Sequence, residues 1–415
     1  MSVPLPVVIV GAGLAGLACA IELQDNNRPF LMIEGSDRIG GRLSTDRLAG
    51  YQLDRGFQVF LTAYPECRRL LNYEKLKLHN FAAGALVWSG GHLQTVVDPF
   101  RDPASAFATL FAPIGSLADK IRIWTLKEEL INKPVEEIFS QGSMTTLEAL
   151  RKRKFSDDMI KKFFKPFLGG IFLENDLTTS SKMFEFVFSM FSQGFAALPA
   201  DGMQAIPEQL VAKIPSDYIM LNTKVIGIGE NYVEIDSGVK IESSAIVIAT
   251  DGSEAGKLVK GFPNIETRAV SCFYYEVHEP PTKLPILMLN GEGKGVVNNV
   301  CVPSIVSSTY GNGKNHLVSV SVLGNPFQDN DAADRAVKKE LKHWFGEDVA
   351  TWRLLRLYRV VNALPDQPPS ALEVPRREVR FQKGLYVCGD HRDNASINGA
   401  LESGRRTALQ LIAEA

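Results

Sequence analysis

The chain has 415 residues, a length that predicts roughly two to three domains and leaves room for a large hydrophobic core. Its formal charge of −2, with 45% hydrophobic and 22% charged residues, gives no reason to expect nucleic acid as a partner. No run of about eighteen uncharged apolar residues occurs, so we expect no transmembrane helix and a cytoplasmic protein that is at most peripheral to a membrane.

The chain opens with a strand and a glycine-rich turn. Val7–Val10 is a short apolar run, and Gly11, Gly13 and Gly16 follow it in the spacing GxGxxG before an Ala/Leu-rich helical pattern. Gly11 is expected to form the tight turn, and Gly13 to let backbone N–H groups approach a pyrophosphate. Gly16 is expected to let the helix pack close to the strand. This arrangement predicts a site for an adenine dinucleotide.

The start of this helix and the end of the next strand complete the predicted nucleotide site. A pyrophosphate is favoured at the helix N-terminus, which comprises Leu14, Ala15 and Gly16, because unpaired N–H groups and the helix dipole attract negative charge. A second apolar strand, Phe30–Ile33, ends on Glu34. At that place a carboxylate can accept hydrogen bonds from the ribose hydroxyls of the adenosine half, and it disfavours a 2′-phosphate.

The pattern changes character after residue 60. We expect a helix over Tyr64–Leu76, a hairpin over Gly84–Val97 and largely helical structure over 104–193. Ten phenylalanines could line an apolar substrate cavity, although plain helix–helix core is the stronger interpretation for each one. They are Phe155, Phe163, Phe164, Phe167, Phe172, Phe184, Phe186, Phe188, Phe191 and Phe195.

A local basic cluster lies in the same region. It runs over 151–154 and continues at Lys161, Lys162 and Lys165. A solvated helix face is its simplest interpretation, and a membrane-surface contact is the alternative. The five cysteines are scattered without a CxxC pair or a nearby histidine, which predicts reduced, mostly buried thiols and no metal site.

The remaining sequence returns to the nucleotide-binding pattern twice. Strands are expected over 218–221, 224–228, 232–235 and 245–249, and a last strand, turn and helix follow from Gly384. Between them, strands at 270–277 and 317–322 and a helix at 332–345 indicate an insertion. We predict an α/β protein with a discontinuous dinucleotide-binding domain, 1–60, 195–262 and 352–415, and an inserted α+β substrate domain, 61–194 and 263–351.

Several motifs in order along the chain carry a resemblance to a known family. They are the Gly40-Gly41-Arg42 turn, the Asp54/Gly56 pair, the segment 198–203, and the Gly389-Asp390 turn with the helix after it. With the N-terminal fingerprint, they resemble the flavin amine oxidase superfamily over nearly the whole chain. That superfamily includes monoamine oxidases, protoporphyrinogen oxidase and phytoene desaturases. The resemblance implies a Rossmann-like domain of the glutathione-reductase type that binds FAD.

The resemblance also implies roles for individual residues. Arg42, after Gly41, is expected near the FAD pyrophosphate, and Gly56 and Phe57 against the flavin ring, where a side chain on Gly56 would collide. Further expected contacts are Val225 with adenine, Asp390 with the ribitol hydroxyls, and the helix starting near Ile397 with the N1/C2=O edge of the flavin.

Two departures bear on the reaction. The stretch Arg359–Pro365 has no cysteine to which flavin could be attached, so noncovalent FAD is expected. The strand Arg268–Tyr275 lacks the lysine that many amine oxidases carry. The leading hypothesis is hydride transfer from an apolar small molecule to flavin N5, as in desaturases or protoporphyrinogen oxidase. Amine oxidation to an imine with release of peroxide is one alternative, and a non-redox flavin-binding or isomerising protein is another.

No Ser/His/Asp triad or paired carboxylates stand out, which agrees with a reaction carried by the cofactor. Phe57, Tyr310, Tyr358 and Asn362 are candidates to face the substrate. His391 is the histidine nearest a predicted flavin contact, and a structural role is its simpler interpretation. The oligomeric state is left open by the sequence.

Overall fold

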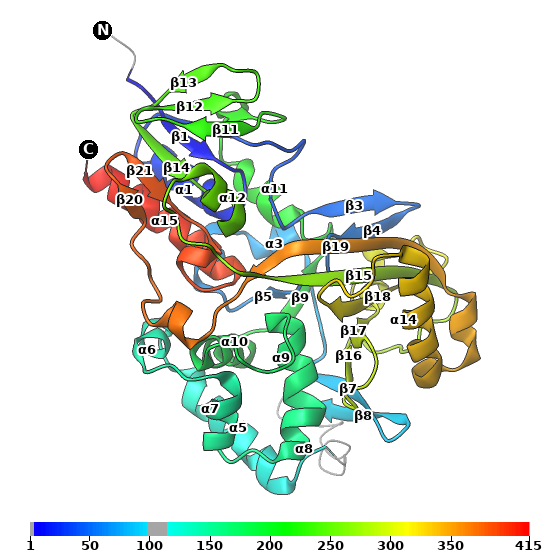
Figure 1. The fold of residues 1–415 in the computed structure, drawn as a ribbon. Coiled ribbons are helices and arrows are strands. Elements are labelled where there is room, and N and C mark those ends of the chain that lie inside the picture. The colour runs from blue at the N-terminus through cyan, green and yellow to red at the C-terminus, as the bar shows by residue number, and fades with distance from the viewer. Residues whose placement is uncertain (1–3, 98–113, 415) are drawn as a thin grey trace.

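A six-stranded sheet forms the base of the predicted nucleotide-binding part in this computed structural model, which describes residues 4–97 and 114–414 (Figure 1). Its order is β10 (Ile219–Met220), β2 (Phe30–Ile33), β1 (Val7–Val10), β14 (Ala245–Ile248), β21 (Leu385–Val387) and β20 (Arg380–Gln382). The first five strands run parallel, and β20 is antiparallel to β21. Strands from the beginning, middle and end of the chain therefore lie side by side, as the sequence predicted.

Different elements cover the two faces of this sheet. Because side chains alternate along a strand, neighbouring residues of β1 pack against opposite layers. Val7 and Ile9 lie in one buried cluster with α1 (Leu14–Asp25) and α15 (Ile397–Ala413). Val8 and Val10 lie in another, with the three-stranded sheet of β11 (Val225–Ile228), β12 (Tyr232–Ile235) and β13 (Lys240–Glu242) and with α12 (Gly252–Leu258). The central strands are buried on both faces, which explains their uninterrupted apolar sequences.

A seven-stranded sheet forms the second part of the molecule (Figure 1). Its order is β19 (Arg353–Pro365), β15 (Thr267–Val277), β18 (His316–Leu323), β17 (Val297–Cys301), β16 (Leu287–Asn290), β7 (Gly84–Ser89) and β8 (His92–Val97). α14 (Asn330–Phe345) covers one face, where Trp344 stacks on Trp88. The hairpin at 84–97 is confirmed, whereas β16 and β17 were not expected.

The pairing of β19 corrects one predicted boundary. The segment from 352 was assigned to the dinucleotide-binding domain, but β19 pairs with β15 along most of its length. Because both strands belong to the seven-stranded sheet, residues 353–365 lie with the inserted part. The rest of the division into domains stays a prediction.

A helical layer forms the third part. It contains α5 (Leu117–Ile131), α6 (Val135–Ser140), α7 (Thr146–Lys152), α8 (Asp157–Met159), the π-helix η1 (Ile160–Phe164), α9 (Lys165–Phe172) and α10 (Ser181–Gln193). Its phenylalanines largely pack against each other, as Phe164 does with Phe155 and Phe184. Core packing therefore accounts for most of them, while Phe195 is exposed. The predicted helical residues 104–113 lie outside the described part of the chain.

Short elements connect these parts. They are β3 (Thr45–Leu48), β4 (Tyr51–Asp54), β5 (Phe60–Leu61), α2 (Pro65–Leu70), α3 (Tyr73–Leu76), β6 (Leu78–Asn80), β9 (Ala196–Pro199), α11 (Ala205–Val211), α13 (Pro303–Val306), and the 3₁₀ turns η2 (Ser216–Tyr218), η3 (Ser308–Tyr310), η4 (Glu347–Thr351), η5 (Pro369–Leu372) and η6 (Asp390–Arg392). The single helix expected over 64–76 is two helices, because Leu71 is extended and Asn72 caps α3 by accepting a hydrogen bond from the backbone N–H of Lys75.

Candidate FAD-binding and substrate site

The glycine turn after β1 has two of the properties that its sequence predicted, the tight turn at Gly11 and the close packing at Gly16. Gly11 has φ +108°, and a Cβ there would lie 2.9 Å from the Ala249 carbonyl oxygen. A Cβ on Gly16 would lie 2.1 Å from the Gly11 carbonyl oxygen, so only glycine allows α1 to approach the strand so closely. A Cβ on Gly13 would meet nothing within 4 Å. Open space therefore lies in front of the turn at Gly13.

The start of α1 fits a phosphate group. Gly13 is the N-cap and supplies no side-chain cap, and the first turn contains no acidic residue. The first N–H groups of a helix, here those of Leu14, Ala15 and Gly16, have no intrahelical partner. An anion such as the FAD pyrophosphate would satisfy them and interact favourably with the helix dipole.

Glu34 lies beside this turn but has partners that the sequence did not suggest. One carboxylate oxygen accepts a hydrogen bond from the Ala12 N–H at 2.8 Å, and the other accepts from the Ser36 N–H and hydroxyl at 2.9 and 2.8 Å. The Glu34 carbonyl accepts from the Thr223 N–H at 2.9 Å, which brings the segment before Val225 alongside. Glu34 therefore holds the glycine turn as well as being the predicted ribose contact.

Arg42 and Asp390, which were assigned to different parts of FAD, form an ion pair. The distance from Arg42 Nη2 to Asp390 Oδ1 is 2.7 Å, and Arg42 Nη1 donates to the Ala363 carbonyl at 3.0 Å. Burial lowers the pKa of Arg42, but the neighbouring Asp390 outweighs burial and raises it overall. Gly41, with φ +59°, leads into this side chain, and a Cβ there would lie 3.3 Å from Gly13. The Gly40-Gly41-Arg42 turn thus lies directly against the glycine turn of β1.

His391 is buried beside this pair. Its ring lies edge-on to Phe262, 5.9 Å between centroids, and its Nδ1 is 4.0 Å from Asp390 Oδ1. Both ring nitrogens are buried without a hydrogen-bond partner in the protein. Burial lowers the pKa of His391 to about 4, against the attraction of Asp390, so the imidazole is neutral at pH 7.

Asp54 is a buried acceptor that connects three segments, although it was noted only as part of a motif. It is buried and accepts hydrogen bonds from the Thr45 hydroxyl at 2.5 Å, the Met203 N–H at 3.0 Å and the Tyr310 hydroxyl at 2.8 Å. Burial raises its pKa, although these bonds favour the charged form. Asp54 thereby joins β4 to the 198–203 segment, two residues before Gly56.

Gly56 and Phe57 follow β4 at the edge of the seven-stranded sheet. Gly56 has φ +95°, and a Cβ there would have only ordinary contacts, 3.7 Å from Val360 Cγ2 and 4.0 Å from Val270 Cγ1. The protein therefore leaves room at Gly56, and a collision there would need the predicted flavin ring. Phe57 is half-buried and lies edge-on to Phe81.

The other predicted cofactor contacts lie at element ends. Val225 begins β11 and is buried, and Ile397 begins α15, where the Ser396 hydroxyl caps the helix by accepting from the Gly399 N–H at 3.0 Å. A Cβ on Gly404 would lie 2.0 Å from the Ala15 carbonyl oxygen, so α15 packs directly on α1. The contacts of Val225 and Ile397 with FAD stay predictions.

Three of the substrate-facing candidates have other partners. Tyr310 is 1% exposed and its hydroxyl donates to Asp54, so that expectation is wrong. The Tyr358 hydroxyl donates to Asp46 Oδ2 at 2.8 Å, and Asn362 Oδ1 accepts from the Thr267 hydroxyl at 2.9 Å. The hydroxyl of Tyr310 thus ties the turn η3 to β4, whereas Tyr358 and Asn362 are half-buried and bond to β3 and β15.

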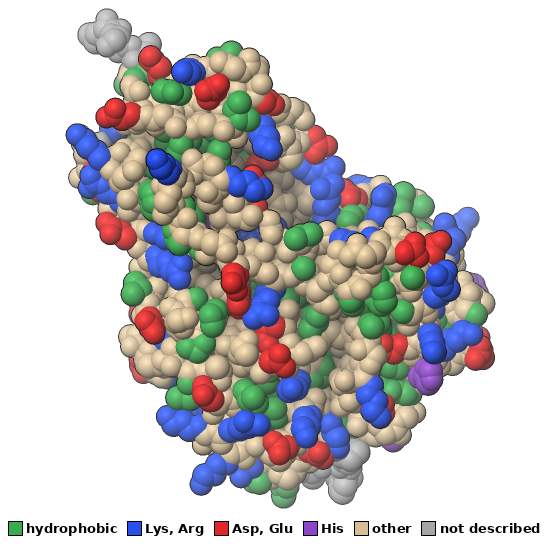
Figure 2. All heavy atoms as spheres, in the orientation of Figure 1, with side chains coloured by type: hydrophobic (Ala, Val, Ile, Leu, Met, Phe, Trp, Pro, Cys, Tyr) green, Lys and Arg blue, Asp and Glu red, His purple; other side chains and the backbone are tan. Residues whose placement is uncertain are grey.

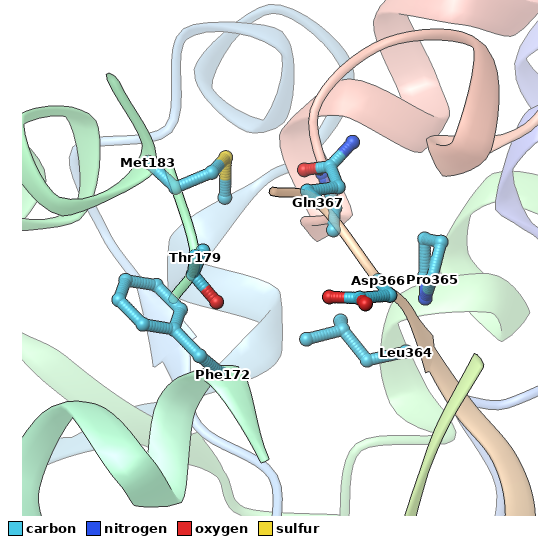
Figure 3. A pocket seen from close by; sticks show the side chains of 8 residues that line it. Phe172, Thr179, Met183, Leu364, Pro365, Asp366 and Gln367 are labelled. Carbon is cyan, nitrogen blue, oxygen red and sulfur yellow. Dashed lines mark hydrogen bonds between the residues drawn. The ribbon is translucent and has the colours of Figure 1, made fainter. Parts of the chain in front are cut away.

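A small pocket lies between the helical layer and the end of β19 (Figure 3). Its lining combines residues of α9, α10, β19 and the approach to α15: Phe172, Thr179, Met183, Leu364, Pro365, Asp366, Gln367 and Ala395. Its volume of about 10 Å³ holds about one water, so a larger ligand has to separate its walls. The sequence missed the set because its members come from distant segments, although Phe172 had been noted as a candidate for lining a cavity.

Comparisons with known proteins agree with this geometry. The sequence profile of the flavin-containing amine oxidoreductase family matches residues 14–412. The chain belongs to this family. The family accounts for the predicted FAD cofactor, and the fold is that of a Rossmann-like FAD domain with a second, inserted part.

Individual relatives are distant. The chain is 22% identical over 303 residues to coproporphyrinogen III oxidase of Bacillus subtilis, a match that spans 62% of each protein. A crystal structure from Exiguobacterium sp. 255-15, whose protein carries a provisional assignment as a protoporphyrinogen oxidase, superposes with a TM-score of 0.76 at 16% identity over 100% of both chains. Cyclohexylamine oxidase from Brevibacterium oxydans gives 0.69 at 16% identity, with 99% of each chain covered.

Other predictions can be compared with the described residues. All five cysteines are buried and free, as expected. Over 4–97 and 114–414, no helix is long and apolar enough to cross a membrane, and no group of three or more potential metal ligands occurs. On the face in Figure 2, basic and acidic side chains are interspersed.

Proposed function

We propose that this enzyme oxidises a carbon–hydrogen bond of a large, apolar small molecule, as a desaturase or a protoporphyrinogen oxidase does. The pocket at the end of β19 carries this proposal through the character of its walls, which a ligand of this size has to separate. Its walls are mainly apolar, and its one carboxylate, Asp366, is paired with Arg268 at 3.0 Å. Such a lining favours a ligand that binds by burying apolar surface.

The protein's part in the reaction is binding, orientation and exclusion of water. Bound FAD supplies the two-electron acceptor. The glycine turn, Glu34, Arg42 and Asp390 are the residues that would hold it, and the apolar pocket walls would orient the substrate and keep water out. Because a hydride acceptor needs no acid–base partner from the protein, this proposal is consistent with the absence of an unpaired acid or base among the pocket-lining residues.

Amine oxidation is the second candidate, favoured by the fold shared with cyclohexylamine oxidase. A cationic amine is normally recognised by an unpaired carboxylate or an aromatic cage. Here Arg268 already neutralises Asp366, and the strand 268–275 has no lysine. The relatives that are named as coproporphyrinogen III and protoporphyrinogen oxidases also support a macrocycle over an amine.

We also propose that FAD is held noncovalently. No cysteine occurs in 359–365, and each of the five cysteines is buried as a free thiol whose pKa is raised by burial. Precipitation of the holoenzyme with acid should release all of the flavin into the supernatant. Flavin that stays with the denatured protein would contradict this proposal.

Anaerobic titration of the FAD-loaded enzyme tests the proposed reaction. We expect bleaching of the flavin absorbance by a large macrocycle such as coproporphyrinogen III or protoporphyrinogen IX, whose apolar ring carries carboxylate side chains, and none by putrescine or cyclohexylamine. Bleaching by the amines alone would reverse the ranking. A flavin that no donor can bleach would support a non-redox flavin-binding or isomerising protein.

A further inference from the structure

An arginine is paired with the one carboxylate that lines the pocket. Arg268 is the second residue of β15, directly opposite Leu364 of β19 in the strand register. Its Nη2 is 3.0 Å from Oδ1 of Asp366, which with Leu364 lines the pocket. In Figure 3 the Asp366 carboxylate points from the end of β19 toward Phe172 and Thr179 on the opposite wall.

The Arg268 guanidinium has hydrogen-bonding capacity to spare. It carries five N–H donors, of which Asp366 takes one. The buried Nε has no partner in the protein. The side chain keeps 32% of its surface exposed, compared with 17% for Asp366. A part-buried cation with unfilled donors is typical of a group that binds an anion.

The position of Arg268 relates it to the predicted flavin site. Two residues along β15, Val270 lies opposite Val360, and this pair flanks Gly56. On the paired strand, the carbonyl of Ala363 accepts a hydrogen bond from Arg42. The paired strands that carry Arg268 therefore also carry residues next to Gly56 and the acceptor of Arg42.

We propose that Arg268 binds a carboxylate group of the substrate, which is then an apolar molecule carrying an acid group. This inference rests on the proposed function, because it takes the pocket as the substrate site. Asp366 has two effects: it holds the guanidinium in place, and it competes with the substrate carboxylate for the same donors. The same pair disfavours a cationic amine, because the arginine repels it.

A purely structural role would give different results. If Arg268 and Asp366 only tie the start of β15 to the residues after β19, removing either side chain should loosen both strands. Affinity for every pocket ligand would then fall together, and both variants would have lower melting temperatures. A substrate-binding role instead predicts opposite effects of the two variants on an anionic ligand.

Binding of three matched probes to the FAD-loaded protein tests the proposal by calorimetry. The probes are decanoate, methyl decanoate and decylamine, which share one apolar chain and differ in charge. The variants are Arg268→Gln, Arg268→Lys and Asp366→Asn. Arg356→Gln is the control, because Arg356 is exposed on β19 and distant from the pocket.

We expect the wild type to bind decanoate more tightly than the ester, and decylamine most weakly. Arg268→Gln should weaken decanoate about ten- to a hundredfold, as expected for loss of a charged hydrogen bond, and leave the ester unchanged. Arg268→Lys should restore part of the loss, and Asp366→Asn should strengthen decanoate binding. Arg356→Gln should change nothing.

The proposal would be overturned if Arg268→Gln changed the affinities for decanoate and for its ester equally. It would also be overturned if the wild type bound decylamine as tightly as decanoate, or if Asp366→Asn bound decanoate more weakly than the wild type. Because this readout needs no turnover, it separates the inference from the proposed reaction. Bleaching by an uncharged apolar donor with no carboxylate preference would leave the proposed function standing and remove the role of Arg268.

Discussion

Replacement of His391 by phenylalanine should protect the protein against acid. The His391 ring packs on Phe262, and a Cβ on Gly389 would lie only 2.4 Å from it, so a flat ring fills this space. Phenylalanine keeps that shape without a titratable group. It also removes two buried nitrogens that have no partner.

The direction of the pKa shift of His391 follows from the groups around its ring. Burial is the main cause of the low pKa of His391, and the positive charges of Arg392, Arg42 and Arg377 add to it. Asp390 acts in the opposite direction. Protonation of His391 is therefore disfavoured in the folded state.

The size of the stability loss in acid follows from the difference between the pKa values of His391 in the folded and unfolded states. The pKa is about 4 in the fold and 6.5 in the unfolded chain, so the unfolded state binds more protons between these values. Stability that is present above pH 6.5 is lost as the pH falls toward 4. A difference of about 2.5 pKa units corresponds to a loss of about 3 kcal/mol.

Urea unfolding of the two proteins at several pH values between 4 and 8 measures this effect. The free energy of unfolding of His391→Phe, relative to wild type, should rise by about 3 kcal/mol between pH 7 and pH 4. The same substitution at exposed His343 is the control and should show no such trend. If the wild type and His391→Phe respond to acid in parallel, the buried neutral imidazole is not a source of acid sensitivity.

Three further outcomes are expected. Glu34→Ala should weaken FAD binding about ten- to a hundredfold in a fluorescence titration, because a charged hydrogen bond contributes about 1.5–3 kcal/mol. An unchanged affinity for FAD would show that Glu34 is not part of the site. Gly404→Ala should lower the melting temperature and FAD retention, because the added Cβ would overlap the Ala15 carbonyl. Gly256→Ala is the control and should lower neither, because its Cβ meets nothing. Equal behaviour of the two variants would contradict the close packing of α15 on α1. Asp54→Asn should cost about 1–3 kcal/mol in chemical unfolding by leaving a buried donor without an acceptor. A neutral result would contradict the hydrogen bonds that Asp54 accepts from Thr45, Met203 and Tyr310.

The local sequence was sufficient to predict the conformation of the glycine turn after β1. Steric requirements at Gly11 and Gly16 are set by atoms of the same strand–turn–helix unit and its neighbouring strand. Apolar runs such as Val7–Val10 and Ala245–Ile248 indicated a buried parallel sheet for the same reason: each strand is covered on both faces. The family resemblance added the order in which the cofactor residues occur.

The partners of polar side chains were decided by the tertiary structure. Nothing in the sequence near Arg42 indicates that it meets Asp390, 348 residues later, or that Tyr310 turns inward to Asp54. The pocket and the pair Arg268–Asp366 likewise depend on the register of β15 against β19 and on the helical layer facing them. Short-range patterns determine backbone conformation and burial, whereas the pairing of charged and polar groups depends on which distant segments the fold brings together.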